Sequence, residues 1–238
     1  MSYPEPIITS ANATPAIPAG RAMGCLPRSS LPGAICPLAA EHIKLVPRAD
    51  WAALAKEISL RPFVKVVLDQ NGVGSCAAEA TNGGVMIARA FAGLEHVLLN
   101  PWGLYHFTSG GADRGSAIDD NLAFARDRGC FPESVWPRTK GWKATPSAEA
   151  REVAKTFRIV EFFDIVSIDE MVSALLTGFP VVYGASGHAV VKVAHIDESK
   201  ALDLNSWGET WGDKGFGVWA SYRAVNWAYG AFAVRVAT

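Results

Sequence analysis

Hydrophobic and polar residues follow one spacing in the first part of the chain and another in the second. Helical spacing predicts helices at residues 52–60, 76–92, 101–107, 118–128 and 147–157. Alternating spacing then predicts strands at 158–164, 180–185, 188–196, 201–204, 215–220 and 231–236, interrupted by one helix at 168–177. Helices followed by mostly antiparallel strands indicate an α+β protein, with a helical lobe at 45–140, a β lobe at 141–238 and a cleft between them.

Local signals refine three of these helices. Asn100 followed by Pro101 is typical of a helix start, and Ser116 with Asp119 predicts a weak capping box before the next helix. The Gly-Gly pair at 83–84 is costly inside a helix. We therefore expect that helix to pack closely against a neighbour at this pair.

Residues 1–44 form a different kind of segment, because prolines and glycines interrupt every helical pattern in it. Its prolines are Pro4, Pro6, Pro15, Pro18, Pro27, Pro32 and Pro37. The composition predicts an extended arm, and such an arm stays ordered only where something holds it. We expect the arm either to wrap its own body, across the cleft, or to pack on neighbouring subunits, with a disordered tail as the simpler alternative.

Composition and charge exclude several classes of protein. The 238 residues suffice for one large domain or two packed lobes, and the net charge of −1 with 19% charged residues gives no sign of a nucleic-acid partner. No apolar run approaches the length of about 18 residues that a membrane span needs. The first residues lack the basic and apolar regions of a secretory signal, so we expect synthesis in the cytoplasm and no membrane partner.

A stretch near residue 70 carries the first chemical signal. A strand-like run at 64–68 leads into a glycine-broken turn, and Cys76 follows where a helix is predicted to begin. A thiol in the first turn of a helix faces unpaired N–H groups and the positive end of the dipole, which favour thiolate. Gln70 can offer an amide N–H beside the sulfur, as in sites that hold a tetrahedral oxyanion. A buried cysteine that opens an ordinary helix is the simple alternative.

A predicted hairpin near the end of the chain favours the nucleophile. Its strands, 188–196 and 201–204, place His188 and Asn205 side by side at the open end. A Cys nucleophile, a His base and an amide that orients the imidazole form a triad with Asn in the third role. His195 is expected to face the opposite side of the strand, and the histidines share no spacing typical of a metal site. We expect neither a metal nor another cofactor.

Three blocks of the sequence resemble the signature of the papain-like cysteine peptidases. They are Gln70…Gly74-Ser75-Cys76, Gly187-His188-Ala189-Val190 and Asn205-Ser206-Trp207-Gly208…Trp211-Gly212…Gly215-Phe216-Gly217. Each block is weak alone, but all three in this order are specific, and the resemblance covers roughly residues 45–238. It implies the papain-like two-lobe fold and hydrolysis of peptide bonds through a Cys76 thiolate and a His188 imidazolium. The further roles it implies are Asn205 as orienting residue, Gln70 as oxyanion donor and Trp207 as cover of the His–Asn hydrogen bond.

The resemblance also implies where a peptide substrate would bind. In papain-like enzymes an extended strip just ahead of a helix hydrogen-bonds the substrate backbone. Gly115 and Ser116 match this strip by position, with Ser116 in place of the usual second glycine. Ile118 would line the pocket beside the scissile bond, although an apolar helix residue can equally belong to the core. With Trp207, these are the substrate-binding residues that we expect.

Two positions depart from the family pattern. The residue after the nucleophile, usually Trp, is Ala77, and the Cys usual three residues before the nucleophile is Val73. The disulfide framework of the family therefore looks absent, which fits a reducing compartment. Both changes alter the wall that supports the oxyanion loop, so we expect modest activity. Cys25 and Cys36 could pair with each other, and Cys130 is expected to be a packed small hydrophobe.

Two classes of function remain open at this point. The compact, disulfide-poor sequence resembles papain-like proteins encoded by bacteria and their phages, some of which ride on the phage particle. The first class is a thiol peptidase acting on a peptide or protein, which the filled triad positions favour. The second is a structural or decoration protein of a virion, in which residues 1–44 contact other subunits. A Cys-His-Asn acyl transferase such as a transglutaminase is a weaker third alternative.

Overall fold

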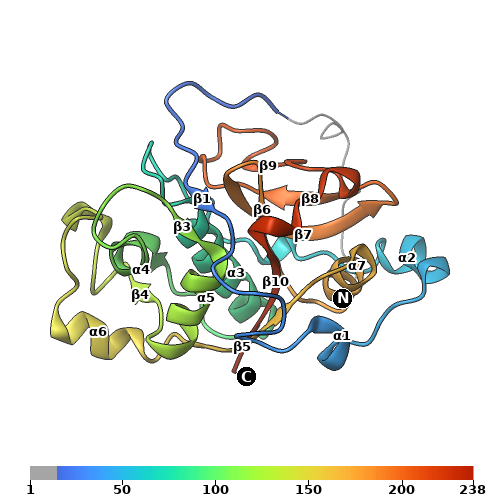
Figure 1. Ribbon diagram of the computed structural model, residues 1–238, viewed down its shortest axis with the longest axis horizontal. Helices are drawn as coiled ribbons and strands as arrows, with labels where there is room; N and C mark the ends of the chain where they lie inside the picture. Colours follow the sequence, from blue (N-terminus) through green and yellow to red (C-terminus); the bar gives the residue numbers. More distant parts are fainter. Residues whose placement is uncertain (1–14, 238) are drawn as a thin grey trace.

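The structure is a computed structural model, and it describes residues 15–237 (Figure 1). Its helices and strands, in chain order, are β1 (Cys25–Leu26), α1 (Ala39–His42), α2 (Arg48–Leu54), α3 (Cys76–Phe91), β2 (Leu99–Asn100), α4 (Pro101–Thr108), β3 (Ser116–Ala117), α5 (Ile118–Asp127), β4 (Phe131–Pro132), α6 (Ala148–Ala154), β5 (Ile159–Asp164), α7 (Ile168–Leu176), β6 (Val181–Ala185), β7 (His188–Asp197), β8 (Lys200–Leu204), β9 (Phe216–Gly217) and β10 (Ala231–Val236). Four 3₁₀ turns join them: η1 (Arg61–Phe63), η2 (Arg138–Lys140), η3 (Tyr222–Ala224) and η4 (Trp227–Tyr229). No helix in the described part of the chain is long and apolar enough to span a membrane.

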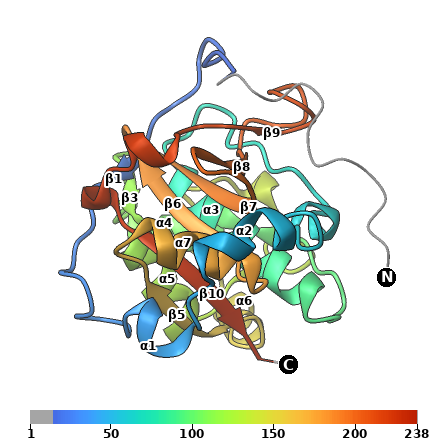
Figure 2. The ribbon, with the colours of Figure 1, turned by 90° about the vertical axis from the view of Figure 1, so that its right-hand side faces the viewer.

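An antiparallel sheet of six strands, in the order β5-β10-β6-β7-β8-β9, forms the centre of the molecule. Helix α3 packs on one face, and α7 covers the other together with α1 and α2 (Figure 2). Two hydrophobic clusters fill the spaces on either side of the sheet. The predicted α+β class and the antiparallel C-terminal sheet are therefore confirmed.

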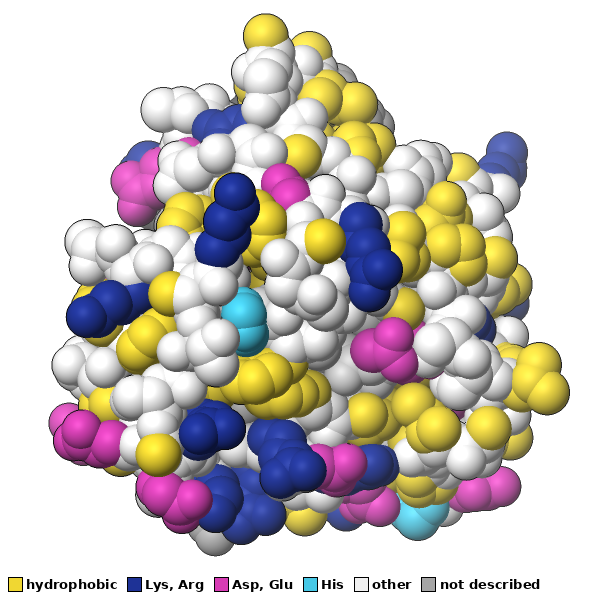
Figure 3. All heavy atoms as spheres, turned by 60° about the vertical axis from the view of Figure 1, so that its left-hand side comes forward, with side chains coloured by type: hydrophobic (Ala, Val, Ile, Leu, Met, Phe, Trp, Pro, Cys, Tyr) yellow, Lys and Arg dark blue, Asp and Glu magenta, His cyan; other side chains and the backbone are white. Residues whose placement is uncertain are grey.

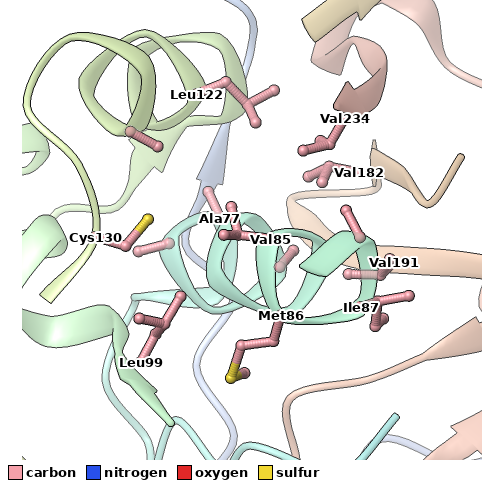
Figure 4. Close-up of a cluster of buried hydrophobic side chains, with 14 of the residues drawn as sticks. Ala77, Val85, Met86, Ile87, Leu99, Leu122, Cys130, Val182, Val191 and Val234 are labelled. Carbon is pink, nitrogen blue, oxygen red and sulfur yellow. The ribbon is translucent and has the colours of Figure 1, made fainter. Parts of the chain in front are cut away.

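Helix α3 is buried over most of its length, which is why it can carry small residues and glycines. A Cβ on Gly84 would approach Cγ2 of Val182 to 2.9 Å, and one on Gly83 would lie 3.4 Å from Cγ2 of Val191. Figure 4 shows side chains of the sheet on one side of α3 and side chains of the neighbouring helices on the other. The predicted close packing at the glycine pair is confirmed, and it fixes the position of the N-terminus of α3.

Three expectations about local structure were wrong. Residues 64–68 form no strand: they run extended, and Leu68 accepts a hydrogen bond from the N–H of Gly208 rather than joining a ladder. The helix expected at 52–60 is α2, which begins at Arg48, directly after Pro47, and ends at Leu54. The strand expected at 215–220 is reduced to β9, a two-residue strand at the edge of the sheet.

A β-bulge also corrects the prediction for His195. The pairing of β7 with β8 shifts around Val193, which is an extra residue on β7. The extra residue returns His195 to the face of the strand that carries His188. There its Nδ1 lies 2.9 Å from the hydroxyl oxygen of Tyr222, and its ring meets that of Trp51 edge to face. His195 is therefore a packing residue, as expected, although it lies on the same face of the strand as His188 and not on the opposite one.

The N-terminal arm ends earlier than its composition predicts. Ala39 and Ile43 are buried in the cluster under α7, so α1 belongs to the folded body. The extended part that the structure describes is residues 15–37, and we call this segment the arm. It crosses the molecule where the α3–α5 side meets the sheet (Figure 1). The prediction for residues 1–14 lies outside the described residues.

Candidate active site

Cys76 is the first residue of α3, and its side chain has no exposed surface. A turn with Asn71 and Gly72 at positive φ precedes it, so the chain reverses sharply before the helix starts. Burial raises the pKa of Cys76 to about 11, although backbone N–H groups of Gly24, Ala189 and the adjacent Ala77 donate toward the sulfur and act in the opposite direction. Burial therefore favours the neutral thiol in this form of the protein.

The β7–β8 hairpin brings His188 and Asn205 together as predicted. Nε2 of His188 lies 2.7 Å from Oδ1 of Asn205, and both side chains are buried. The other ring nitrogen, Nδ1, is also buried and has no hydrogen-bond partner among residues 15–237. Burial lowers the pKa of His188 to about 4, whereas the hydrogen bond that Nε2 donates to Oδ1 of Asn205 acts in the opposite direction. In this covered form burial disfavours the expected thiolate–imidazolium pair, because it penalises both charges.

Two tryptophans hold the imidazole of His188. The ring of Trp207 stacks on it at 4.5 Å between centroids, and the ring of Trp219 meets it edge to face at 4.9 Å. Trp207 has no exposed surface, so it covers the His–Asn pair, as the resemblance implies, and does not face a substrate here. Trp219 escaped the sequence analysis. Its backbone N–H donates to Asp203, which forms a fully buried ion pair with Lys192.

The side-chain amide of Gln70 has a fixed orientation. Its Oε1 accepts hydrogen bonds from Oγ of Ser206 at 2.8 Å and from Nε1 of Trp207 at 3.1 Å. These two donors turn the NH₂ group the other way, where it donates to the carbonyl oxygens of Val73 at 2.7 Å and of Ala22 in the arm at 3.0 Å. The amide predicted as the oxyanion donor therefore binds a carbonyl group of the arm in this structure.

The arm lies directly over the thiol. The N–H of Gly24 points at the sulfur of Cys76, and its carbonyl oxygen accepts a hydrogen bond of 2.9 Å from the N–H of Ser116. Residues of β1 pair with β3 in parallel, and the N–H of Cys25 donates to the carbonyl of Gly187, next to His188, at 2.9 Å. A Cβ on Gly24 would come within 1.9 Å of a backbone carbonyl oxygen in the nucleophile loop, so only glycine fits here.

Ion pairs fasten the arm on both sides of this crossing. On one side the guanidinium of Arg21 bonds both carboxylate oxygens of Asp69 and also donates to the carbonyl of Trp207 at 3.0 Å. On the other side Arg28 makes two hydrogen bonds, of 2.5 and 3.1 Å, to the fully buried carboxylate of Asp164. Bidentate, partly buried pairs of this kind are the strong ones.

Asp119 provides a third anchor and corrects the predicted capping box. Helix α5 begins after Ala117 without a side-chain cap. Instead the buried carboxylate of Asp119 accepts hydrogen bonds from the backbone N–H and the hydroxyl of both Ser29 and Ser30, at 2.7–3.1 Å. An acidic residue that the sequence analysis assigned to helix capping therefore holds the arm.

The predicted substrate strip is in contact with an extended peptide segment, which is the arm itself. Ser116 bonds the arm through its N–H, while its hydroxyl accepts from Nδ2 of Asn121 at 2.8 Å. A Cβ on Gly115 would lie 2.3 Å from the carbonyl oxygen of Gly24, so this strip too requires glycine. Ile118 is fully buried, and its Cδ1 and the sulfur of Cys25 both lie against the backbone of β6.

An ion pair that the sequence analysis missed supports the nucleophile loop. Glu79, one turn into α3, is buried; it pairs with Arg138 of η2 and accepts from Oγ of Ser75 at 3.1 Å. Arg138 also donates to the carbonyl oxygen of Asp69, beside Gln70. The only local signal is a glutamate within a run of alanines on a buried helix, because the arginine comes from a distant segment.

Hydrogen bonds to Asp113 also hold the nucleophile loop, next to Val73, where the family usually carries a disulfide-bonded cysteine. The N–H of Gly74, next to Val73, donates to Oδ1 of Asp113 at 2.8 Å, and the hydroxyl of Tyr105 donates to the same oxygen at 2.7 Å. These bonds tie the loop to the segment ahead of β3. The family departure at Val73 is therefore accompanied by a polar tether.

All four cysteines are free and buried. Cys25 lies in the arm over the site, whereas Cys36 lies near Asp164, so the two do not form the disulfide that remained open from the sequence. Burial raises the pKa of Cys36 and of Cys130 to about 12. Cys130 is fully buried in the hydrophobic cluster around α3, as expected for a packed small residue.

Solved structures of cysteine proteases superpose on this arrangement over most of the chain. Xylellain, a cysteine protease from Xylella fastidiosa, matches with a TM-score of 0.68 and 19% identity over 94% of this chain and 100% of its own. This protein has the papain-like fold. A procathepsin B of Trypanosoma congolense matches with a TM-score of 0.65, 15% identity and coverage of 92% of this chain and 88% of its own. A digestive procathepsin L 3 of Tenebrio molitor matches with a TM-score of 0.62 and 18% identity, over 75% of this chain and 69% of its own.

No protein-family model matches the sequence, and no curated protein matches it at a significant level. The papain-like fold is therefore recognised through the course of the backbone and through the three short blocks around Cys76, His188 and Asn205. Over the aligned residues, these three structures share only 15–19% sequence identity with this chain.

Proposed function

We propose that this protein is a cysteine peptidase that its own arm holds in a latent form. One observation carries the proposal: an extended peptide segment lies across Cys76 and bonds the groups that a peptide substrate needs. Its carbonyl groups accept from Gln70 and Ser116, and one of its N–H groups donates to the backbone beside His188. A surface that binds one peptide backbone in this way fits the backbone of another.

The proposed reaction uses the residues of the triad in their usual order. After the arm leaves, Nδ1 of His188 takes the thiol proton, and the sulfur of Cys76 attacks a peptide carbonyl carbon. The amide of Gln70 and the backbone N–H of Cys76 hold the oxyanion. The imidazolium protonates the leaving amine, and water, deprotonated by the imidazole, hydrolyses the thioester. Asn205 keeps the ring in position throughout.

The contacts of Gly24 suggest how the arm blocks the site. The sulfur of Cys76 meets the N–H of Gly24, which is a hydrogen-bond donor and no electrophile. The carbonyl groups of Ala22 and Gly24 accept hydrogen bonds from Gln70 and Ser116. Attack requires a carbonyl carbon close to the sulfur in line with its lone pair. We therefore propose that the arm inhibits as a tightly held peptide that presents an N–H group to the sulfur.

The alternative of an assembly protein draws less support from the structure. It rested on an arm that contacts other subunits, whereas the described part of the arm bonds within its own chain through Asp69, Asp119 and Asp164. Association with a virion or another assembly remains a prediction. The peptidase proposal needs only contacts that are present in the chain.

A peptide-cleavage assay on the full-length chain tests the proposal. Gly24→Ala should lift the arm, because the added methyl collides with backbone that cannot yield. We expect this variant to hydrolyse a pool of fluorogenic peptides, and the wild type to do so far more slowly. Leu31→Ala, which truncates an exposed side chain of the arm, is the matched control. A folded G24A variant that cleaves no peptide faster than G24A/C76A does would contradict the proposal.

A further inference from the structure

A cavity of about 550 Å³ lies between α4, α5, β4 and α6, on a side of the molecule that the arm does not cover. This volume falls within the range of about 300–1,000 Å³ typical of small-molecule sites. Its lining consists of Phe107, Phe124, Arg128, Phe131, Ala148, Arg151, Glu152 and Lys155. None of these residues takes part in the site around Cys76, so the proposed peptidase activity does not explain why the cavity is there.

Aromatic rings form the inner wall of this cavity. The rings of Phe107 and Phe124 stack at 5.2 Å with an angle of 19° between planes, and that of Phe131 lies 6.3 Å from each. Phe107 and Phe124 are only half-buried, although they belong to the main hydrophobic cluster. The facing residue on α6 is Ala148, which is too small to cover them. An apolar wall is thus left open to a ligand.

Positive charge gathers at the mouth. Glu152 pairs with Lys155 at 2.7 Å. The guanidinium groups of Arg128 and Arg151 make no hydrogen bond or ion pair within residues 15–237. Figure 3 shows dark-blue Lys and Arg side chains beside an exposed hydrophobic area on this face. Two unpaired guanidinium groups offer the planar donor fork that suits a carboxylate, sulfonate or phosphate.

Helix dipoles account for the positive charges but not for the cavity. Arg128 and Lys155 are the C-caps of α5 and α6, and Arg151 lies in the last turn of α6, so the dipoles favour all three side chains. Dipole stabilisation requires no aromatic cavity beside them. An open aromatic wall is costly in water unless something covers it. An apolar wall with a cationic rim matches a ligand that has an apolar body and a negative charge.

We infer that this cavity binds a small organic anion with a planar apolar body. The body lies against the three phenylalanine rings, and the anionic group bonds Arg128 and Arg151. Aromatic carboxylates have this shape and charge, and aryl phosphates share the same chemistry.

Equilibrium dialysis of the full-length protein against sodium 2-naphthoate tests the inference. We expect saturable binding of one molecule with a Kd between about 10 μM and 1 mM. R128Q/R151Q should weaken it at least about tenfold, and Arg223→Gln, an exposed arginine on η3, should not change it. Ala148→Trp fills the cavity from an exposed position and should abolish binding, with its melting temperature as the check on folding.

Other probes separate the two properties of the ligand. Naphthyl phosphate in place of naphthoate should bind with comparable affinity, since both carry the anion and the ring. Inorganic phosphate alone and the neutral amide of 2-naphthoate should bind at least about tenfold more weakly, because each lacks one property. Equal binding of the neutral amide, unchanged binding to A148W, or no saturable binding of naphthoate would overturn the inference.

Discussion

The two walls of the active site are stabilised in different ways. On the sheet wall, His188 and Asn205 lie on adjacent strands of one hairpin and are packed by two tryptophans. On the helix wall, Cys76 and Gln70 depend on polar partners from distant segments, above all Arg138 and Asp113.

This difference indicates which wall of the site should depend more on the arm. Trp207 and Trp219 pack the imidazole, and neither belongs to the arm, so we expect this packing to persist when the arm leaves. The arm bonds the sheet wall through backbone carbonyl groups, those of Trp207 and Gly187. On the helix wall it bonds the side chains of Asp69 and Gln70. We therefore expect release of the arm to change the helix wall more than the sheet wall.

Removing the base is expected to have the largest effect. In the arm-released G24A background, His188→Ala should lower the rate of peptide hydrolysis at least about 10³-fold, because the thiol loses its proton acceptor. The initial rate with fluorogenic peptides measures this, and His96→Gln, an exposed histidine, serves as control. A loss smaller than tenfold would mean that the sheet wall does not supply the base.

Breaking the ion pair behind the nucleophile loop tests the helix wall. Arg138→Met leaves the buried carboxylate of Glu79 uncompensated, so the free energy of unfolding should fall by about 3 kcal/mol. The double variant E79L/R138M should regain most of that loss, since no buried charge remains. Urea unfolding of both variants measures the difference, and equal stability of the single and the double variant would contradict the role given to this pair.

Acid should open the covered site. The pKa of His188 is about 4 under the arm, below its ordinary value of 6.5, so the covered form binds fewer protons than an uncovered form with an ordinary imidazole. As pH falls from 6.5 toward 4, the proton is therefore taken up by the uncovered form, which gains population. Limited proteolysis of the arm from pH 7.5 to 4.5 should become faster in wild type and change much less in H188A. Equal acid acceleration in both proteins would contradict this account.

Weakening a single arm anchor should give the smallest effect. Asp119→Asn removes the charge that four donors of the two arm serines approach, so the arm should loosen by up to about tenfold in its docking equilibrium. Asp120→Asn is the matched control, because the exposed Asp120 meets only one arm hydroxyl, at 2.6 Å. Hydrogen exchange of the arm amides reports the result, and an equal effect of both substitutions would assign the stabilisation to general surface charge.

Much of this arrangement could be predicted from the sequence, for a physical reason. Helices α3 and α7 and strands β5–β8 and β10 carry strong periodic patterns, and the hairpin places His188 beside Asn205 through local pairing alone. The strand expected at 64–68 and the facing of His195 failed because tertiary contacts decided them. The arm anchors and the Arg138–Glu79 pair join residues 48 to 136 positions apart, which no local pattern encodes.

The central claim is that Cys76 becomes an accessible nucleophile only when the arm leaves. The most direct measurement is the second-order rate of inactivation by an epoxysuccinyl inhibitor at neutral pH, with the adduct located by intact mass. We expect one adduct per chain to form at least about tenfold faster in full-length G24A than in wild type or L31A, and none in G24A/C76A. No adduct in G24A, or equal rates in G24A and wild type, would contradict the account of a latent thiol peptidase.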